Sequence, residues 1–240
     1  VGMSTAEMVN IKKETNSVAG LPEEMGGSGD PSPVTAYGVY CGMKAAAKQA
    51  YGSERLSGRK VSIQGGGNVG RGLAALLVKD GAQVFITDIH EDKLAAIKAE
   101  IPEVNLVKPD AIYDLDVDIY APCALGATVN DETLKKLKCS VICGAANNQL
   151  ADEAVHGMAV MRKGILYAPD FLVNAGGIIN CAWERKGYNR KAAMRQTEGI
   201  YDTALRIFRS SADLDILTYL AANQAAEHRI TSMREAGLRF

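Results

Sequence analysis

The sequence predicts an α/β fold built on a doubly wound parallel sheet. Three observations support this. Short strand patterns alternate with helical patterns from residue 60 onward, the strand segments are apolar throughout, and a glycine-rich turn joins the first strand to the first helix. Continuous apolar strands are typical of a parallel sheet that helices cover on both faces. We therefore expect a ligand crevice at the carboxyl ends of the strands, where the strand order reverses.

The first 59 residues precede this alternation. Ser4 and Glu7 have the spacing of a capping box, which predicts a short helix through Lys13. Residues 20–33 are dense in Gly, Pro, Ser and Asp and are expected to form a loop. Pro33 suits a helix start, so a long helix is expected over residues 34–50.

From residue 60 the elements are expected in alternation. Strands are expected over residues 60–64, 83–87, 104–107, 117–121, 140–143 and 165–168. Helices are expected over residues 68–80, 91–100, 131–137 and 151–162, then from residue 173 to about 186, and finally over 190–211 and 214–234. Gly176 and Gly177 fall inside a helical pattern. Each costs about 1 kcal/mol relative to alanine, so the pair indicates close approach of another surface.

Residues 61–88 contain the pattern that indicates a ligand. Gly65 suits a tight turn, Gly67 lets the backbone approach a pyrophosphate, and Gly70 lets the helix pack closely on its strand. The helix start then presents N–H groups and partial positive charge to the phosphates. Asp88 ends the second strand about 20 residues later, where a carboxylate binds a ribose 2′-hydroxyl and would repel a 2′-phosphate.

This context predicts a Rossmann-type dinucleotide site and favours NAD over NADP. FAD uses the same fingerprint, so on this stretch alone it remains the competing cofactor. The non-functional interpretation is a glycine-rich loop that only tightens a turn between a strand and a helix. Further along, the expected carboxyl ends of later strands carry small residues at 121–126, 144–148 and 168–170. Asn147 and Asn148 there would offer hydrogen-bonding groups to a ligand, or serve as ordinary turn residues.

Composition excludes several partners. The 240 residues carry a formal net charge of −1 and no strongly basic stretch, so neither nucleic acid nor an anionic membrane is a predicted partner. No apolar run approaches the roughly 18 residues of a membrane helix, and no leader is visible at the start. Five irregularly spaced cysteines are expected to be reduced thiols of a cytoplasmic protein, and three isolated histidines predict no metal site.

Five motifs in order carry a resemblance that covers nearly the whole chain. They occupy residues 29–40, 64–70, 121–126, 144–150 and 167–177. The sequence resembles the NAD-binding C-terminal half of the glutamate/leucine/phenylalanine/valine dehydrogenases, most closely the leucine dehydrogenase branch. The resemblance implies NAD-dependent oxidative deamination of an L-amino acid to a 2-oxo acid and ammonia, in a homo-oligomer. Hydride would pass from the substrate Cα to the nicotinamide.

The resemblance also implies roles for individual residues. Those expected around the pyrophosphate are Gly65, Gly66, Gly67, Asn68, Val69, Gly70 and Arg71. Asp88 would hold the adenosine ribose. Those expected at the nicotinamide end are Thr35, Ala121, Cys123, Asn147 and Asn174, with Asn174 hydrogen-bonded to the carboxamide. Ile178 and Cys181 would contact the substrate side chain.

Ile178 and Cys181 would form a medium-sized apolar wall suited to a branched aliphatic side chain. One methylene discriminates only about 10- to 200-fold in such a pocket, so leucine, valine and isoleucine are all expected substrates, with phenylalanine less favoured. The same spacing of three residues is also what a helix facing the core would show.

The family's catalytic lysines and aspartate are expected outside this sequence. The resemblance places the lysines in an N-terminal substrate domain and the aspartate directly before a Val-Gly pair such as Val1–Gly2. We therefore expect residues 1–59 to be a hinge and connecting helices, 60–186 the NAD-binding domain, and 187–240 helices packed on it. The chain alone would bind NADH without turnover. The alternative is a non-catalytic NAD(H)-binding module or sensor that works with a partner chain.

Overall fold

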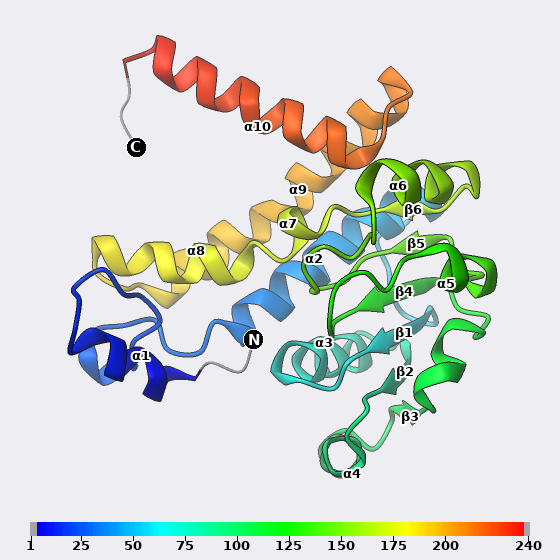
Figure 1. Ribbon diagram of the computed structural model, residues 1–240, viewed down its shortest axis with the longest axis horizontal. Coiled ribbons are helices and arrows are strands. Elements are labelled where there is room, and N and C mark those ends of the chain that lie inside the picture. The colour runs from blue at the N-terminus through cyan, green and yellow to red at the C-terminus, as the bar shows by residue number, and fades with distance from the viewer. Residues whose placement is uncertain (1–3, 238–240) are drawn as a thin grey trace.

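The computed structural model describes residues 4–237, and its centre is one six-stranded, all-parallel sheet (Figure 1). The strands are β1 (Lys60–Gln64), β2 (Gln83–Thr87), β3 (Asn105–Leu106), β4 (Ile119–Pro122), β5 (Val141–Ile142) and β6 (Leu166–Tyr167). Their order is β3-β2-β1-β4-β5-β6, so the order reverses between β1 and β4. The prediction of a doubly wound α/β fold is confirmed, and the crevice of such a sheet lies beyond the carboxyl ends of β1 and β4.

Helices surround the sheet. They are α1 (Thr5–Lys12), α2 (Ser32–Tyr51), α3 (Asn68–Lys79), α4 (Glu91–Glu100), α5 (Asp131–Lys136), α6 (Glu153–Arg162), α7 (Asp170–Val173), α8 (Gly176–Ala182), α9 (Arg190–Leu214) and α10 (Thr218–Glu235). Short 3₁₀ turns are η1 (Glu23–Met25), η2 (Pro109–Tyr113) and η3 (Trp183–Lys186). The predicted capping box is present, since Ser4 accepts from the first turn of α1 while Glu7 accepts from the Ser4 N–H.

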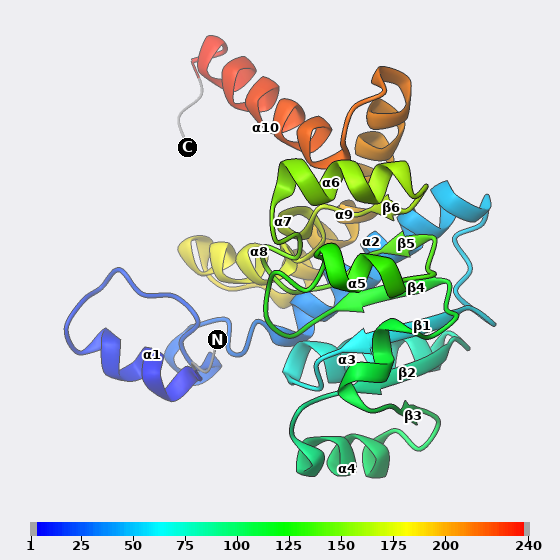
Figure 2. The same ribbon diagram turned by 45° about the vertical axis from the view of Figure 1, so that its right-hand side comes forward.

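Alternate residues of β4 enter two separate cores, because side chains of a strand point to opposite faces. In β4, Ile119 and Ala121 join the core that α2, α3 and α4 cover. Tyr120, between them, joins the core that α5 and α6 cover. Figure 2 shows the helices of these two layers on either side of the strands. Helices on both faces explain why the strand segments are apolar throughout.

Several expected elements differ in extent from those observed. The strand expected at 104–107 is only β3, whose two residues are exposed at the edge of the sheet. The strand expected at 117–121 begins at Ile119. The continuous helix expected from residue 173 to about 186 is divided into α8 and η3, preceded by the separate turn α7. The turn η2 lies where no element was expected.

The consecutive glycines lie against the start of α2, as the sequence indicated. A Cβ atom on Gly176 would collide with the carbonyl oxygen of Val34, and one on Gly177 would lie 2.7 Å from Thr35 Oγ1. Only glycine allows this approach without displacing backbone. The prediction of a close surface is confirmed, and the contact brings Thr35 beside α8.

The segment before α2 is fastened to α8 and η3 by polar groups. Glu184 Oε1 accepts the N–H groups of Gly20 and Ser28, both at 2.8 Å. Fully buried Asn180 donates to the Ser28 carbonyl at 3.2 Å and accepts from the Tyr188 hydroxyl at 2.8 Å. The loop over residues 20–28 therefore has a fixed position on α8.

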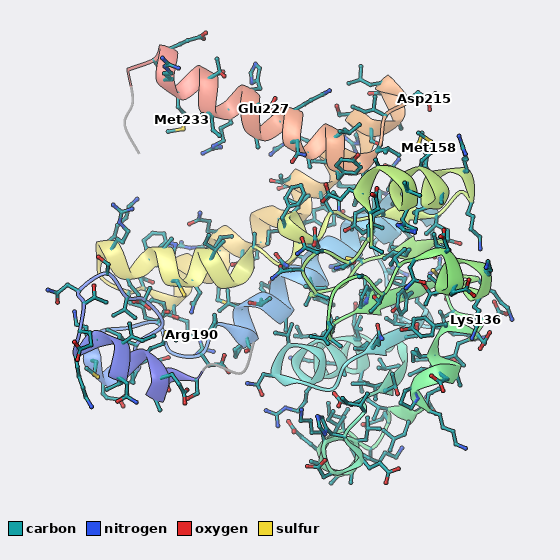
Figure 3. All side chains as sticks on the ribbon, in the orientation of Figure 1. Lys136, Met158, Arg190, Asp215, Glu227 and Met233 are labelled. Carbon is teal, nitrogen blue, oxygen red and sulfur yellow. The ribbon has the colours of Figure 1, made fainter. Side chains whose placement is uncertain are left out.

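The two C-terminal helices are packed very differently. Helix α9 lies along α2 and buries Ile200, Ala204 and Phe208. Helix α10 buries only Ala221 and Ala222, and its later part, labelled at Glu227 and Met233 in Figure 3, extends away from the other elements. No helix within residues 4–237 has the length and apolar character needed to cross a membrane.

Candidate functional site

The glycine-rich turn has the geometry that the sequence indicated. A Cβ atom on Gly70 would collide with the Gly65 carbonyl oxygen, so glycine lets α3 start directly against β1. Gly65 has φ +112°, a value that L side chains rarely adopt. In contrast, a Cβ atom on Gly67 would meet nothing within 4 Å. The turn is therefore packed tightly on the protein side and open above Gly67.

The start of α3 supplies donors at this opening. Gly67 is the N-cap and no side chain caps the helix, while the first internal bond comes from the Arg71 N–H to the Gly67 carbonyl at 2.9 Å. The N–H groups of Asn68, Val69 and Gly70 precede that bond and have no carbonyl four residues back within the helix. Together with the helix dipole they form a site that suits an anion.

Asp88 lies beside the turn and is oriented by it. Its Oδ2 accepts the Gly66 N–H at 2.7 Å and its Oδ1 accepts the His90 N–H at 3.0 Å. Burial alone would raise the pKa of Asp88, but the N–H groups of His90 and Gly66 hold it below its usual value. The carboxylate is thus fixed and charged at the end of β2, as a ribose ligand requires. Arg71, by contrast, points to Glu100, with 3.4 Å between the charged groups.

A cavity of about 430 Å³ lies at the other side of the crevice. Its lining residues come from α2, the loop after β5, α7 and α8, and they are Thr35, Ala145, Asn147, Phe171, Asn174, Ala175 and Ile178. The glycine turn follows β1, and the loop that lines the cavity follows β5. These strands are two positions apart in the sheet, so about 10 Å separates the turn from that loop. Predicted residues Thr35, Asn147, Asn174 and Ile178 are brought together here from three parts of the chain.

The side-chain amides of the two asparagines of the cavity are fixed in orientation. Asn174 Nδ2 donates to the Ala145 carbonyl at 3.1 Å and to Asn147 Oδ1 at 2.6 Å. A carbonyl can only accept, so the Asn174 NH₂ group must face it, and the Asn147 oxygen must face that NH₂ group. Asn174 Oδ1 and Asn147 Nδ2 make no hydrogen bond within residues 4–237. The pair therefore offers one acceptor and one donor side by side.

Three of the residues predicted for this end lie elsewhere. Ala121 is fully buried in the core under α2 and pairs with Ile63, since its side chain points into the sheet's covered face. Cys123 packs beside Gly70 and Gly65, behind the turn. The Cys181 thiol contacts the Ser28 hydroxyl at 3.8 Å, on the side of α8 that receives the loop over residues 20–28. None of the three lines the cavity.

The sequence analysis missed some residues of the site. Phe171 lines the cavity and is 44% exposed, and Ala145 and Ala175 complete the lining. Phe171 lies four residues after the end of β6, so its position just past a strand was an available signal.

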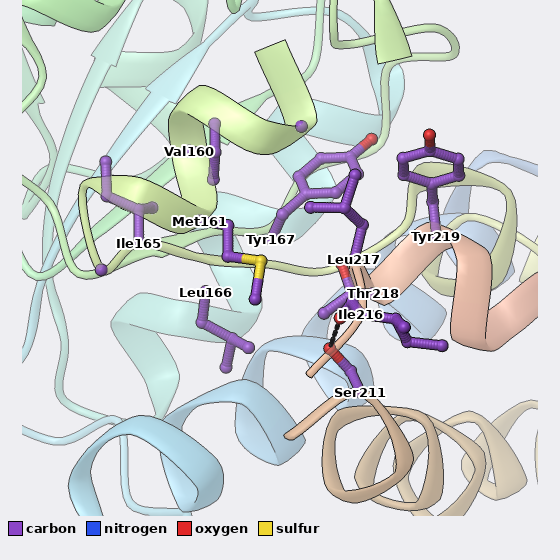
Figure 4. A pocket seen from close by; sticks show the side chains of 12 residues that line it. Val160, Met161, Ile165, Leu166, Tyr167, Ser211, Ile216, Leu217, Thr218 and Tyr219 are labelled. Carbon is purple, nitrogen blue, oxygen red and sulfur yellow. Dashed lines mark hydrogen bonds between the residues drawn. The ribbon is translucent and has the colours of Figure 1, made fainter. Parts of the chain in front are cut away.

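A second cavity lies away from the crevice. It measures about 210 Å³ and is enclosed by α6, β6 and the turn between α9 and α10 (Figure 4). Its walls are mainly apolar, from Val160, Met161, Ile165 and Leu217, and Ser211 Oγ donates to the Ile216 carbonyl at 2.6 Å. No predicted site residue lines it. Within residues 4–237 no group of three or more His, Cys, Asp or Glu side chains is arranged to hold a metal ion.

The residues of the crevice fit a dinucleotide with a carboxamide at one end. The open space above Gly67 and the N–H groups of α3 suit a pyrophosphate, and Asp88 suits a ribose hydroxyl. A carboxamide has one acceptor oxygen and one donor NH₂, which complement Asn147 Nδ2 and Asn174 Oδ1.

Known proteins resemble this chain over its whole length. A sequence profile described as Glutamate/Leucine/Phenylalanine/Valine dehydrogenase matches residues 26–88 and 85–231. The chain is 49% identical to leucine dehydrogenase of Thermoactinomyces intermedius over 240 residues, which is 100% of this chain and 65% of that protein. It is 42% identical to L-tryptophan dehydrogenase of Nostoc punctiforme, covering 98% of this chain and 66% of that one.

The fold agrees with these matches. The crystal structure of L-tryptophan dehydrogenase from Nostoc punctiforme superposes with a TM-score of 0.86 at 40% identity and covers 98% of this chain and 67% of that chain. This chain thus spans about two thirds of the length of the curated relatives it matches. From the profile, the sequence identity and the superposition together, the chain belongs to the Glutamate/Leucine/Phenylalanine/Valine dehydrogenase family, as the five motifs predicted.

Proposed function

We propose that the protein takes part in NAD-dependent oxidative deamination of an apolar, branched-chain L-amino acid to its 2-oxo acid and ammonia. NAD, the predicted cofactor, is confirmed at the level of the family. The observation that carries the proposal is the Asn147–Asn174 pair, whose free donor and acceptor match a carboxamide and lie in one crevice with the glycine turn and Asp88.

Each group of residues has a separate proposed task. The turn from Gly65 to Gly70 and the first N–H groups of α3 bind the pyrophosphate, and Asp88 binds the adenosine ribose. Asn174 and Asn147 orient the nicotinamide by its carboxamide, and Thr35 lines the same end. When bound, NAD accepts the hydride that leaves the substrate Cα. The contribution of this chain is to hold the nicotinamide ring at one angle beside the apolar end of the cavity.

The apolar end supports a substrate with an aliphatic side chain. Ile178 is 73% exposed although it lines the cavity, and Phe171 and Ala175 lie near it in the lining. A charged side chain would lose hydration against these groups without gaining a partner. The chain is similar to dehydrogenases named for leucine, phenylalanine and tryptophan, all apolar amino acids. We favour the branched aliphatic substrates because of Ile178.

The deamination also needs a group that accepts a proton. The seven described residues that line the cavity include neither a lysine nor a carboxylate. We therefore expect the 240-residue chain to bind NADH without oxidising L-leucine. The crevice then supplies cofactor binding, and proton transfer requires groups that these lining residues do not provide.

A fluorescence titration of the chain with NADH tests the proposal. We expect saturable binding that ADP-ribose displaces, since ADP-ribose occupies the glycine turn and Asp88. The matched variant is Asn174→Ala, which should weaken NADH and leave ADP-ribose unchanged. Absence of NADH binding at millimolar concentration would contradict the proposed function. Turnover of L-leucine by the chain alone would contradict the proposal that proton transfer requires groups outside the cavity lining.

We further propose a cytoplasmic homo-oligomer. The five cysteines are free thiols, which suits a reducing compartment. Helix α10 leaves Leu220, near its start, and Ile230, in its later part, exposed, which suits contact with a second copy of the chain. Light scattering that finds a monomer for the full-length protein would contradict the oligomer.

A further inference from the structure

One buried carboxylate joins the loop after β5 to α7. Asp170, the first residue of α7, is only 6% exposed. Its Oδ2 accepts the N–H of Asn148 in a short hydrogen bond, and its Oδ1 accepts the N–H of Phe171 at 2.9 Å. Both oxygens thus serve backbone donors. A buried carboxylate satisfied in this way holds its partners firmly, because loss of the bonds would leave a buried charge without hydrogen-bond partners.

The loop over residues 144–149 depends on this fastening. Asn148 has φ +52°, a left-handed conformation that asparagine tolerates better than most residues. Its carbonyl accepts the Ala127 N–H at 2.7 Å. Inside the loop, fully buried Gln149 donates to the carbonyls of Gly144 and Ala146 at 2.8 and 2.9 Å. Gln149 fixes the shape of the loop, whereas Asp170 at the start of α7 and Asn174 at its C-cap fasten the loop to α7.

Asp170 is connected to both asparagines of the cavity. Asn147 directly precedes Asn148, whose N–H Asp170 holds. Asn174 ends α7, and its N–H donates to the Asp170 carbonyl at 2.9 Å. The bond of 2.6 Å between Asn174 and Asn147 therefore closes a ring that begins and ends at Asp170. Asp170 itself does not line the cavity.

We propose that Asp170 is a positioning residue for the nicotinamide end of the site. It holds the loop over residues 144–149 against α7, so that Asn147 Nδ2 and Asn174 Oδ1 are presented together to the carboxamide. The inference rests on the proposed function, because it assigns the carboxamide to this cavity. A general structural role would affect binding of the whole dinucleotide, whereas this role affects only the binding of its nicotinamide end.

The test compares two ligands that share the adenosine diphosphate end. Asp170→Asn keeps the side-chain shape but places an NH₂ group opposite one of the two N–H donors. In the 240-residue chain we expect the Kd for NADH to rise about tenfold, and the Kd for ADP-ribose, which lacks the nicotinamide, to stay the same. The matched control is Asp152→Asn on α6, where the carboxylate likewise accepts a backbone N–H, from Val155 at 2.8 Å. It should change neither Kd.

A double-mutant cycle with Asn147→Ala completes the test. If Asp170 acts through the asparagine pair, Asp170→Asn adds little to the loss that Asn147→Ala causes. Equal weakening of both ligands, or fully additive effects, would overturn the positioning role, as would an unchanged Kd for NADH. If Asp170→Asn does not fold, Asp170→Ser, which is too short to reach Asn148, is measured in the same way. An unaltered chain that binds NADH no better than ADP-ribose would instead overturn the proposed function.

Discussion

Asn174 donates a hydrogen bond of 2.6 Å from Nδ2 to Oδ1 of Asn147, and its other donor is used by the Ala145 carbonyl. The backbone carbonyl thereby fixes the polarity of two side chains in succession. Asn174 is left with an acceptor and Asn147 with a donor at the cavity. In the proposed site, this relationship would make recognition of a carboxamide specific for its orientation as well as its presence.

A cofactor analogue tests that polarity. Reduced 3-acetylpyridine adenine dinucleotide has a methyl group where NADH has the NH₂ group, so it offers Asn174 Oδ1 no donor. We expect the unaltered chain to bind NADH about five- to tenfold more tightly than the analogue, and Asn174→Ala to lose this preference. Titration by fluorescence measures both ligands. The exposed variant Asn223→Ala should keep the preference; a preference that survives in Asn174→Ala would contradict the assignment.

The substitution Gly67→Ala should weaken cofactor binding without changing the stability of the fold. Its backbone, with φ −70°, is open to any residue, and a Cβ atom there meets nothing within 4 Å. We expect an unchanged Tm but at least about tenfold weaker binding of ADP-ribose, because the methyl group occupies the approach of the pyrophosphate.

The control for Gly67→Ala is Gly199→Ala in α9. A Cβ atom there also meets nothing within 4 Å, and the position is exposed inside a helix. Alanine should stabilise the chain by about 1 kcal/mol and leave binding unchanged. Thermal unfolding and titration of both variants give the comparison; a fall in the Tm of Gly67→Ala would show that the space above the turn is not free.

Asp88 should make the stability of the chain depend on pH. The N–H groups of His90 and Gly66 outweigh burial and lower the pKa of Asp88 from its ordinary value of 3.8. Its stabilising contribution is therefore complete above about pH 5 and is lost as the pH falls below 3.8 through the folded value. Urea unfolding should show Asp88→Ala to be less stable than the unaltered chain at pH 7, with the difference shrinking towards acid pH.

Glu103→Ala serves as the matched variant for Asp88→Ala. It removes an exposed carboxylate that makes no hydrogen bond within residues 4–237. Its difference from the unaltered chain should be small at every pH. A difference for Asp88→Ala that does not change between pH 7 and acid pH would argue against the two backbone bonds.

The thiols should react slowly in the folded chain. Burial raises the pKa of Cys41 and Cys139 to about 11 and that of Cys123 to about 12, so little thiolate exists at pH 8. Half-buried Cys181 is expected to react first with a disulfide reagent, and the other four should react only in denaturant. Cys181→Ser should remove the fast phase of the reaction, which is the modification of Cys181. Rapid reaction of the buried thiols would contradict their positions in the core.

Much of the fold could be predicted because local patterns and the parallel topology agree. The strands at 60–64 and 83–87 and the helix at 91–100 have the observed bounds, since each is bordered by a turn and has a clear period. Strand β3 is short because it is an exposed edge, and α8 begins at Gly176, which lies against the Val34 carbonyl of α2. Both features involve residues that are distant in the sequence, so local patterns do not predict them. The domain boundaries after residues 59 and 186 stay predictions.

The site was predictable in part for the same reason. Asp88 and Asn147 lie in the segments that follow β2 and β5, and the carboxyl ends of parallel strands meet at one edge. Which face of a helix looks into the cavity depends on its packing, so Ile178 and Cys181 could not be distinguished. The Ser28 contact of Cys181 comes from a loop more than 150 residues earlier in the chain. Asp170 lies within the motif at residues 167–177, but its bond to Asn148 depends on how the loop over residues 144–149 folds.

Glu184 has a practical consequence for altering the preferred amino acid. Its carboxylate joins the loop over residues 20–28 to η3. That loop leads into α2, which carries Thr35, and η3 follows α8, which carries Ile178. The parts of the cavity lining that carry Thr35 and Ile178 are therefore joined through Glu184. In the proposed site, a smaller residue in place of Ile178 or Phe171 would make room for a bulkier substrate. Loss of the Glu184 hydrogen bonds would lower selectivity without creating a defined larger space.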